Sequence, residues 1–93
     1  MSLLSRSEIQ EGLENLKGWK YMKDAISKEY SFDSYMDGIS FINLLAVEAE
    51  EYNHHPDMIV GWCKINLTFT SHDLGGITEK CLKMAHAADK IYY

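Results

Sequence analysis

The sequence is poor in the residues that mark several classes of protein. It contains two cysteines, one proline and six glycines among 93 residues, which excludes a disulfide framework and a collagen-like or low-complexity chain. No apolar run approaches the roughly 20 residues that a membrane-spanning helix needs, and the first residues lack the apolar stretch of a signal peptide. We therefore expect a cytoplasmic protein without a membrane segment, with Cys63 and Cys81 as reduced thiols.

Basic residues are also scarce. The chain has nine Lys and Arg against 14 Asp and Glu, a formal net charge of −5, and its Lys and Arg form no cluster. Proteins that bind nucleic acid directly draw much of their affinity from basic patches that neutralise phosphates. The composition therefore disfavours direct binding to nucleic acid or to an anionic membrane surface.

Apolar and aromatic residues are plentiful. Hydrophobic residues make up 46% and aromatic residues 12% of the chain, which is typical of a folded globular domain. Residues 1–93 contain no linker or internal repeat, so we interpret them as a single domain. A chain this short buries proportionally less surface than a long one, so self-association would add stability.

Three segments have the residue spacing of helices. The first covers residues 5–17 and opens with the capping-box pattern Ser5-x-x-Glu8, the second covers 35–52, and the third follows Thr78. The second segment is apolar nearly all round, and a helix of this kind is buried on more than one side. We expect another subunit to cover its second side, giving a homodimer or homotetramer.

Four shorter segments alternate apolar and polar residues as strands do, or are short apolar runs bounded by turn residues. They cover residues 19–22, 26–32, 58–60 and 64–70. The predicted element order is α-β-β-α-β-β-α. Short connections favour antiparallel pairing, so we predict an α+β fold: a four-stranded antiparallel sheet with three helices packed on one face.

Histidines gather at two of the predicted element ends. His54 and His55 follow the central helix and precede Pro56, and His72 follows the last strand, so three of the four histidines lie within nineteen residues. Histidine titrates near neutral pH and is the usual general acid or base. Pro56 restricts His55 to extended backbone, which stiffens its presentation.

Two alternatives compete with catalysis at these positions. A His-His-Pro sequence after a helix is often only a polar helix end. A zinc site is the other alternative, but the spacing matches no common zinc pattern, so we predict no metal. The ligands of such a zinc site would be His54, His55 and His72 with Cys63 or Cys81. His86 lies between lysines at helical spacing and is interpreted as a solvated surface residue.

The spacing Glu50-x3-His54-His55-Pro56-x5-Trp62-x9-His72 resembles the signature of pterin-4a-carbinolamine dehydratases. The resemblance covers nearly the whole chain. It implies a hydro-lyase that dehydrates a 4a-hydroxytetrahydropterin, the product of pterin-dependent aromatic amino acid hydroxylases, to the quinonoid dihydropterin. It also implies that the pterin is the substrate and that no metal or organic cofactor takes part.

The resemblance assigns roles to individual residues. His54, His55 and His72 are the expected catalytic groups, with one of the first two as the base at a pterin ring nitrogen and His72 as the acid at the departing hydroxyl. The residues expected to bind the substrate are Glu50, Pro56, Thr70 and Ser71.

The resemblance also bears on assembly. Family members form homodimers that extend the sheet, and often homotetramers built on the long helix, in agreement with the two apolar sides of residues 35–52. Animal members act in addition as a dimerisation cofactor for a transcription factor. The alternative function is therefore a protein-binding subunit of the same fold with a weakened active site.

Two positions depart from the family pattern. Cys81 stands where an acid three residues after the helix-capping Thr78 is usual, and Asn53 stands where an acid is common. In other family members, the acid at this position either forms half of a capping box or orients a catalytic histidine. Its spacing from the capping residue favours the capping interpretation. The change at position 53 removes a charge that would tune histidine basicity.

Overall fold

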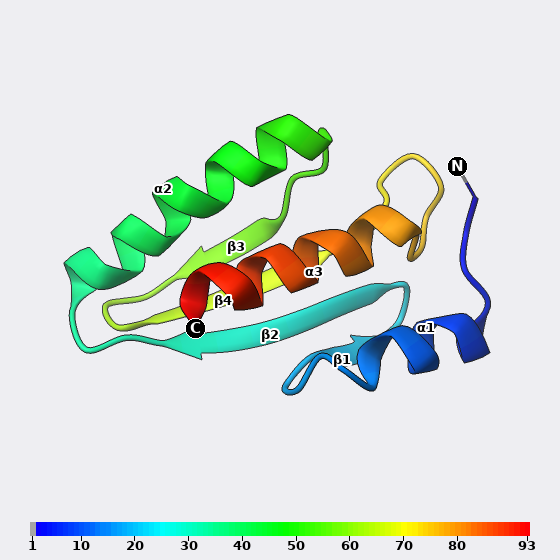
Figure 1. Ribbon diagram of the computed structural model, residues 1–93, viewed down its shortest axis with the longest axis horizontal. Coiled ribbons are helices and arrows are strands. Elements are labelled where there is room, and N and C mark those ends of the chain that lie inside the picture. The colour runs from blue at the N-terminus through cyan, green and yellow to red at the C-terminus, as the bar shows by residue number, and fades with distance from the viewer. Residues whose placement is uncertain (1) are drawn as a thin grey trace.

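The chain folds into three helices and a four-stranded sheet in the predicted order (Figure 1). The computed structural model describes residues 2–93. The elements are α1 (Arg6–Leu13), β1 (Lys20–Met22), β2 (Ala25–Ser31), α2 (Tyr35–Tyr52), β3 (Asp57–Val60), β4 (Lys64–Phe69) and α3 (Glu79–Tyr92). The α+β fold expected from the sequence is confirmed.

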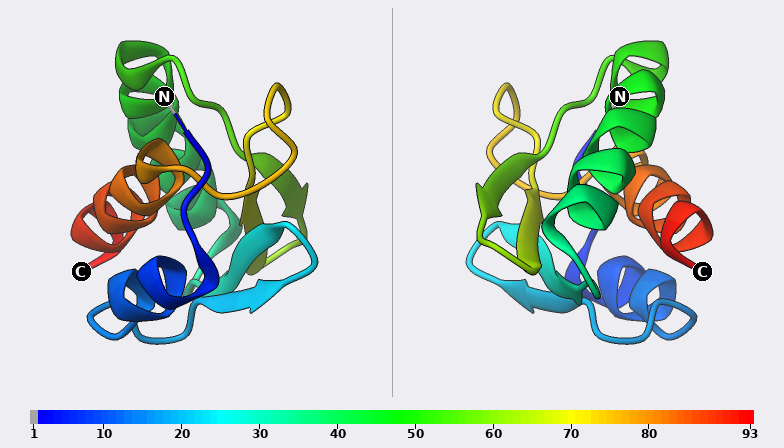
Figure 2. Two further views of the ribbon diagram at one scale, coloured as in Figure 1. Left: turned by 90° about the vertical axis from the view of Figure 1, so that its right-hand side faces the viewer. Right: turned by 90° about the vertical axis from the view of Figure 1, so that its left-hand side faces the viewer.

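The sheet is antiparallel throughout and has the strand order β1-β2-β4-β3. All three helices lie on one face of it, with α3 between α2 and α1, as the two end-on views show (Figure 2). The long strands β2 and β4 are central, and β1 and β3 form the two edges. The carboxyl end of α2, the start of β3 and the end of β4 therefore meet at one end of the molecule.

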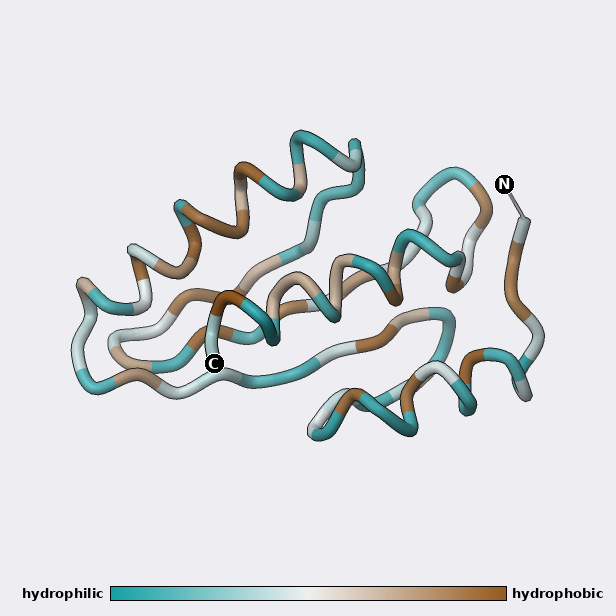
Figure 3. The backbone as a smooth tube through the Cα atoms, viewed as in Figure 1, coloured by the Kyte–Doolittle hydropathy of each residue, from teal (hydrophilic) through white to brown (hydrophobic). Residues whose placement is uncertain are grey.

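The core lies between the two central strands and the helices. Alternate residues of β2 and β4 point to the helices, as the pleat of a strand requires, and the buried ones include Ile26, Tyr30, Leu67 and Phe69. Figure 3 shows how apolar residues recur along these strands and along the helices that cover them. Full burial of one such side chain contributes about 1.5–3 kcal/mol.

The ends of the helices follow from their caps. Ser5 and Glu8 make the predicted capping box, and the Ser34 hydroxyl accepts the Asp37 backbone N–H at the start of α2. The predicted end of the first helix was wrong, because α1 stops at Leu13 instead of reaching residue 17. The chain then continues in tight turns that bring Leu16 into the core.

The helix α2 has a buried and an exposed apolar side. Phe41, Leu45 and Ala49 face the core, whereas the opposite side exposes Met36 and Val47, each by more than 60%. The expected two-sided apolar character is thus confirmed, and coverage of the outer side by another subunit stays a prediction. No helix within residues 2–93 is long and apolar enough to span a membrane.

Candidate active site

The first two histidines are positioned by the way α2 ends. Asn53 caps the helix in the left-handed conformation, with φ 52°, which asparagine adopts more readily than most residues. The backbone N–H of His54 then donates to the carbonyl of Ala49 at 3.0 Å. This closure turns the chain sharply toward β3, so that His54 and His55 project from the junction.

The His54 ring is the most enclosed of the three. It stacks on the buried Phe69 ring, with centroids 6.1 Å apart and planes 17° apart, and its Nε2 lies 3.2 Å from the Cys81 Sγ. Burial, together with the positive charges of Lys80 and the neighbouring histidines, lowers the pKa of His54 below its usual 6.5. His54 is therefore a neutral imidazole near pH 7.

His55 is more exposed and has an acidic partner. Its Nε2 is hydrogen-bonded to the carboxylate of Glu50, in the last turn of α2, and more than half of each side chain is exposed. Pro56 follows and leads into β3 with extended backbone. The pair keeps the His55 ring beside the helix end, where it is open to solvent.

The third histidine lies at the same end of the sheet as the first two, but it follows a strand instead of α2. His72 follows β4, and its Nε2 lies 3.8 Å from the Asp57 carboxylate at the start of β3. Both side chains are largely exposed. The structure thus gives each of the three histidines a different side-chain partner: a thiol, a glutamate and an aspartate.

The three histidines line one open pocket of about 290 Å³. Its residues come from the α2–β3 junction and from the end of β4: Asn53, His54, His55, Pro56, Asp57, Thr70, Ser71, His72 and Asp73. Sequence reasoning missed Asp57 and Asp73 as lining residues. Asp57 had one available signal, since it directly follows His55 and Pro56.

Thr70 and Ser71 lie in the pocket, but their hydroxyls are engaged in holding the loop. The Thr70 hydroxyl donates to the carbonyl oxygen of Asp24, and the Ser71 hydroxyl accepts the Leu74 N–H at 3.2 Å. Backbone hydrogen bonds also join Ser71 to Gly76 and Gly75. These two residues therefore fix the position of His72, and binding of a substrate by them stays a prediction.

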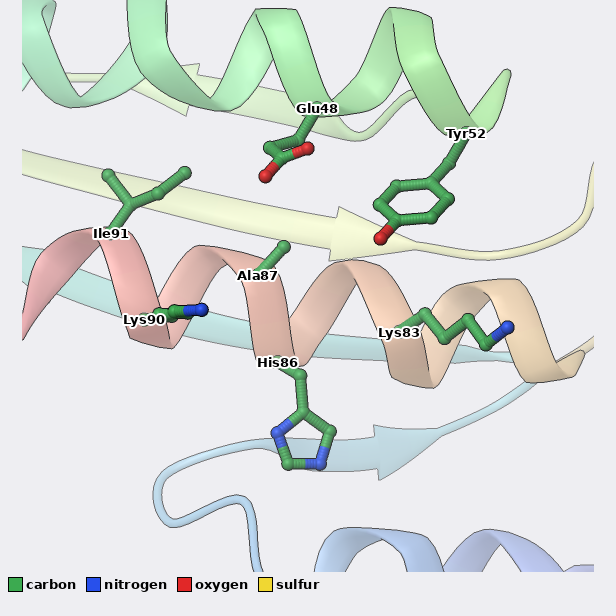
Figure 4. A pocket seen from close by; sticks show the side chains of 7 residues that line it. All are labelled: Glu48, Tyr52, Lys83, His86, Ala87, Lys90 and Ile91. Carbon is green, nitrogen blue, oxygen red and sulfur yellow. The ribbon is translucent and has the colours of Figure 1, made fainter.

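A larger cleft lies elsewhere, between α2 and α3 (Figure 4). It encloses about 600 Å³ and is lined by Glu48, Tyr52, Lys83, His86, Ala87, Lys90 and Ile91. In Figure 4 the His86 ring points from α3 to the side away from Glu48 and Tyr52. His86 is exposed, as predicted, and shares no pocket with the other three histidines among the clefts described above.

The side chains considered as zinc ligands do not assemble into a metal shell. Within residues 2–93, no group of three or more His, Cys, Asp and Glu side chains is placed to hold a metal ion. His54 meets Cys81, whereas His55 and His72 contact carboxylates of their own.

Sequence comparison decides the family. The profile of the family described as pterin 4 alpha carbinolamine dehydratase matches residues 2–91. This chain belongs to that family. A relative from Aquifex aeolicus, provisionally named pterin-4-alpha-carbinolamine dehydratase, is 41% identical over 88 residues, which are 95% of this chain and 89% of the relative. A relative from Mycolicibacterium smegmatis with the same provisional name is 35% identical, over 98% of this chain and 97% of its own.

Solved structures agree with the family assignment. A protein of Brucella melitensis, described as a transcriptional coactivator/pterin dehydratase, superposes with a TM-score of 0.96 at 29% identity, covering 99% of this chain and all of its own. A pterin dehydratase-like RuBisCO assembly factor of the α-carboxysome superposes with a TM-score of 0.67 at 23% identity, covering 80% of this chain and 86% of its own. The second likeness shows the shared fold alone.

The structure accounts for both departures from the family pattern. Asn53 occupies the left-handed position that ends α2. Thr78 stands at the N-cap of α3, but its hydroxyl makes no capping hydrogen bond and lies 3.8 Å from the Cys81 Sγ. The capping interpretation concerns an acid at position 81 and stays a prediction, because this chain has Cys81 there. The Cys81 thiol points instead to His54, which favours the orienting interpretation of position 81.

Proposed function

We propose that this protein dehydrates 4a-hydroxytetrahydropterins to quinonoid dihydropterins by histidine general acid–base catalysis, as part of pterin recycling. The reaction needs two proton transfers. An acid protonates the C4a hydroxyl, so that the C–O bond breaks and water leaves. A base takes the proton from a pterin ring nitrogen, whose electron pair forms the new double bond to C4a.

His54 suits the role of the base. A base must be unprotonated before the reaction, and the lowered pKa of His54 keeps its imidazole neutral near pH 7. Stacking on Phe69 and the contact with the Cys81 thiol hold the ring in one orientation. A fixed, neutral imidazole at the wall of the pocket is prepared to accept a proton from a bound ring.

His72 suits the role of the acid at the departing hydroxyl. It lies across the pocket from the α2–β3 junction, on the other element that builds the site. Asp57 orients its imidazole through the contact with Nε2. His55, held by Glu50, is the second proton donor available to the same pocket and positions the substrate.

The observation that carries the proposal is the convergence of three histidines, each with its own partner, on one open pocket. The test follows the decay of chemically generated 4a-hydroxytetrahydropterin with purified, chelator-dialysed protein. We expect multiple turnovers per chain, and a loss of at least tenfold in His72→Ala. An unaccelerated decay, or an activity that chelation abolishes, would contradict the proposal.

A protein-binding role is the second candidate, and the exposed apolar side of α2 favours it. That side could hold another subunit or a different protein, and the Brucella relative is itself described as a coactivator. The two roles predict different responses to Val47→Glu. A binding subunit loses its partner, whereas a dehydratase keeps the turnover of each folded site.

A further inference from the structure

The loop that carries His72 is held together by its own hydrogen bonds. The Ser71 N–H donates to the carbonyl oxygen of Gly76 at 2.7 Å, and the Gly75 N–H donates to the carbonyl oxygen of Ser71 at 2.8 Å. The Ser71 hydroxyl also accepts the Leu74 N–H. Residues 71–76 therefore form one compact unit. The position of the exposed His72 side chain depends on the contacts that hold the two ends of this loop.

Each end of the loop is held by a segment that is distant in the sequence. At the start, the Thr70 hydroxyl donates to the carbonyl oxygen of Asp24, in the turn between β1 and β2. At the end, the Leu4 N–H donates to the carbonyl oxygen of Ile77 at 2.8 Å. The N-terminal segment, residues 2–5, thus lies beside the end of the loop (Figure 1). None of residues 2–5 lines the histidine pocket, so any effect of this segment on the site is indirect.

The N-terminal segment touches the loop a second time, at Gly76. A methyl group added to Gly76 would lie 2.9 Å from the Leu3 Cδ2, closer than the separation of about 3.5–4.0 Å that carbon atoms in contact adopt. Among the glycines of residues 2–93, positive φ angles occur at Gly18 and Gly75 and not at Gly76. The backbone conformation of Gly76 therefore does not require glycine. Its missing side chain instead lets Leu3 lie directly on the loop.

The N-terminal segment is itself well anchored. Leu4 packs against the hydrophobic core, and Ser5 next to it begins the capping box of α1. Leu3, in contrast, is 49% exposed and lies outside the buried core. The segment therefore connects a fixed helix to the end of the loop that bears His72.

We propose that Leu3 is a positioning residue for His72. Its side chain lies on Gly76, and together with the hydrogen bond between Leu4 and Ile77 it fixes the end of the loop. The loop in turn keeps the His72 imidazole beside the Asp57 carboxylate and in the wall of the pocket. The structural part of this inference stands without turnover, and its kinetic consequence rests on the proposed function.

The kinetic consequence separates catalysis from binding. In the proposed reaction His72 is the acid at the departing hydroxyl, whereas residues 54–56 belong to the α2–β3 junction and do not depend on the loop. A displaced His72 should therefore lower kcat and leave KM nearly unchanged. Misplacement by about 1 Å can cost up to about 10²-fold, and we expect a loss of about tenfold.

The first test inserts a methyl group between the segment and the loop. Gly76→Ala forces the Leu3 side chain or the loop to shift, so the imidazole resonances of His72 should move and kcat should fall about tenfold. When Leu3→Ala is added, the new methyl group occupies part of the space that the Leu3 side chain leaves. Both readouts should then return toward the wild type, which a double-mutant cycle measures. Additive losses in the double variant would contradict the proposal.

Gly12→Ala is the matched control for this insertion. A methyl group at Gly12 of α1 would lie 2.5 Å from the Leu82 Cδ1, so the variant creates the same kind of clash outside the pocket. We expect its melting temperature to fall, while the His72 resonances and kcat keep their wild-type values. Equal changes in kcat and in the His72 resonances of both glycine variants would reflect a general loss of stability and would overturn the proposal.

Leu3→Ala alone tests the contact without adding volume, and it should fold because the side chain is half-exposed. Imidazole NMR should show shifted or broadened His72 signals with those of His54 and His55 unmoved, and Leu3→Met should restore the wild-type spectrum. These spectra judge the positioning of His72 even if no dehydration is detected, so they separate this inference from the proposed function. Unchanged His72 signals in Leu3→Ala, or equal shifts of all three histidines, would overturn the role of Leu3.

Discussion

Polar side chains cluster in two regions of this molecule, and the two clusters are built in opposite ways. The histidine pocket is open, and more than half of the His55, Glu50, His72 and Asp57 side chains is exposed. The second cluster is centred on Asp89 of α3 and is nearly closed, with Lys28 and Asp89 exposed by 8% and 17%.

The Asp89 cluster satisfies its members internally. One carboxylate oxygen of Asp89 accepts from the Lys28 ammonium at 2.8 Å, from the Trp19 ring N–H at 3.3 Å and from the Tyr30 hydroxyl. Burial and the Asp89 carboxylate raise the pKa of Tyr30, so its hydroxyl stays protonated. These contacts tie the end of α3 to β2 and to the segment before β1.

The comparison teaches that clustering of titratable groups alone does not mark a site. In the Asp89 cluster the Tyr30 hydroxyl keeps its proton and the Lys28 and Asp89 side chains are mostly buried, so we expect the cluster to contribute to stability. The histidine pocket keeps ring nitrogens accessible to a ligand and has one imidazole whose pKa lies below the usual value. Open geometry and the direction of the pKa shift together separate the two clusters, since the raised pKa of Tyr30 keeps a proton on its hydroxyl and the lowered pKa of His54 frees a ring nitrogen to accept one.

The largest effect is expected from removing the base. His54→Ala should lower turnover by about 10²–10⁴-fold, because general bases contribute on this scale, with little change in the melting temperature. His86→Ala, an exposed histidine on α3, is the control and should match the wild type in steady-state kinetics. Loss of activity in His86→Ala with activity kept in His54→Ala would reverse the comparison.

The complementary effect is expected on stability. Asp89→Ala leaves the buried Lys28 ammonium without its carboxylate, which should lower the free energy of unfolding by about 3–5 kcal/mol. Turnover of the protein that remains folded should be unchanged. Glu29→Ala breaks the exposed pair with Lys64 and should cost about 1 kcal/mol or less. Urea unfolding of the two variants measures the difference, and equal costs would show that the Asp89 cluster is not structural.

A smaller effect is expected at the thiol beside His54. Cys81→Asp places a carboxylate next to the His54 Nε2, which should raise the pKa of the imidazole and increase turnover several-fold if position 81 orients the ring. The melting temperature should hardly move. Cys81→Ser is the control that adds no charge. A gain in stability with unchanged kinetics would support the capping interpretation.

The smallest effect is expected on the pH dependence of kcat/KM and of stability. Because the native pKa of His54 lies below the usual 6.5, the acid limb of kcat/KM should fall below pH 6.5. In the unfolded chain the His54 imidazole becomes protonated near pH 6.5. In the native state it becomes protonated only at lower pH. Stability from a neutral His54 is therefore present above pH 6.5 and is lost as the pH falls toward the native pKa. Melting curves of wild type and His54→Ala between pH 5 and 7.5 should diverge on the acid side.

The sequence predicted the elements well where the pattern is local. Alternation over 26–32 and 64–70 marked both central strands, and the predicted helix over 35–52 matches α2 at both ends. The end of α1 was misplaced because Leu16 continues the apolar spacing while the chain already turns. Apolar spacing along the sequence indicates which side chains are buried. It does not determine the backbone conformation by which they become buried.

All of the predicted site residues except Glu50 line one pocket, but the side-chain partners of its histidines were mostly not predicted. The histidines could be found because they stand at element ends in a family spacing. The contact of Cys81 with His54 joins residues 27 positions apart, and the Asp89 cluster joins α3 to a strand 61 positions earlier. Such partners depend on how α3 packs over the sheet, which no local pattern of α3 reveals.

The central claim is that the open histidine pocket, and neither the Asp89 cluster nor the cleft between α2 and α3, receives the pterin. Imidazole NMR of the four histidines during titration with a stable oxidised pterin tests it in the unmodified protein. We predict that the resonances of His54, His55 and His72 shift together and saturably, while His86 stays unchanged. A shift of His86 alone, with the other three histidines unmoved, would contradict the claim.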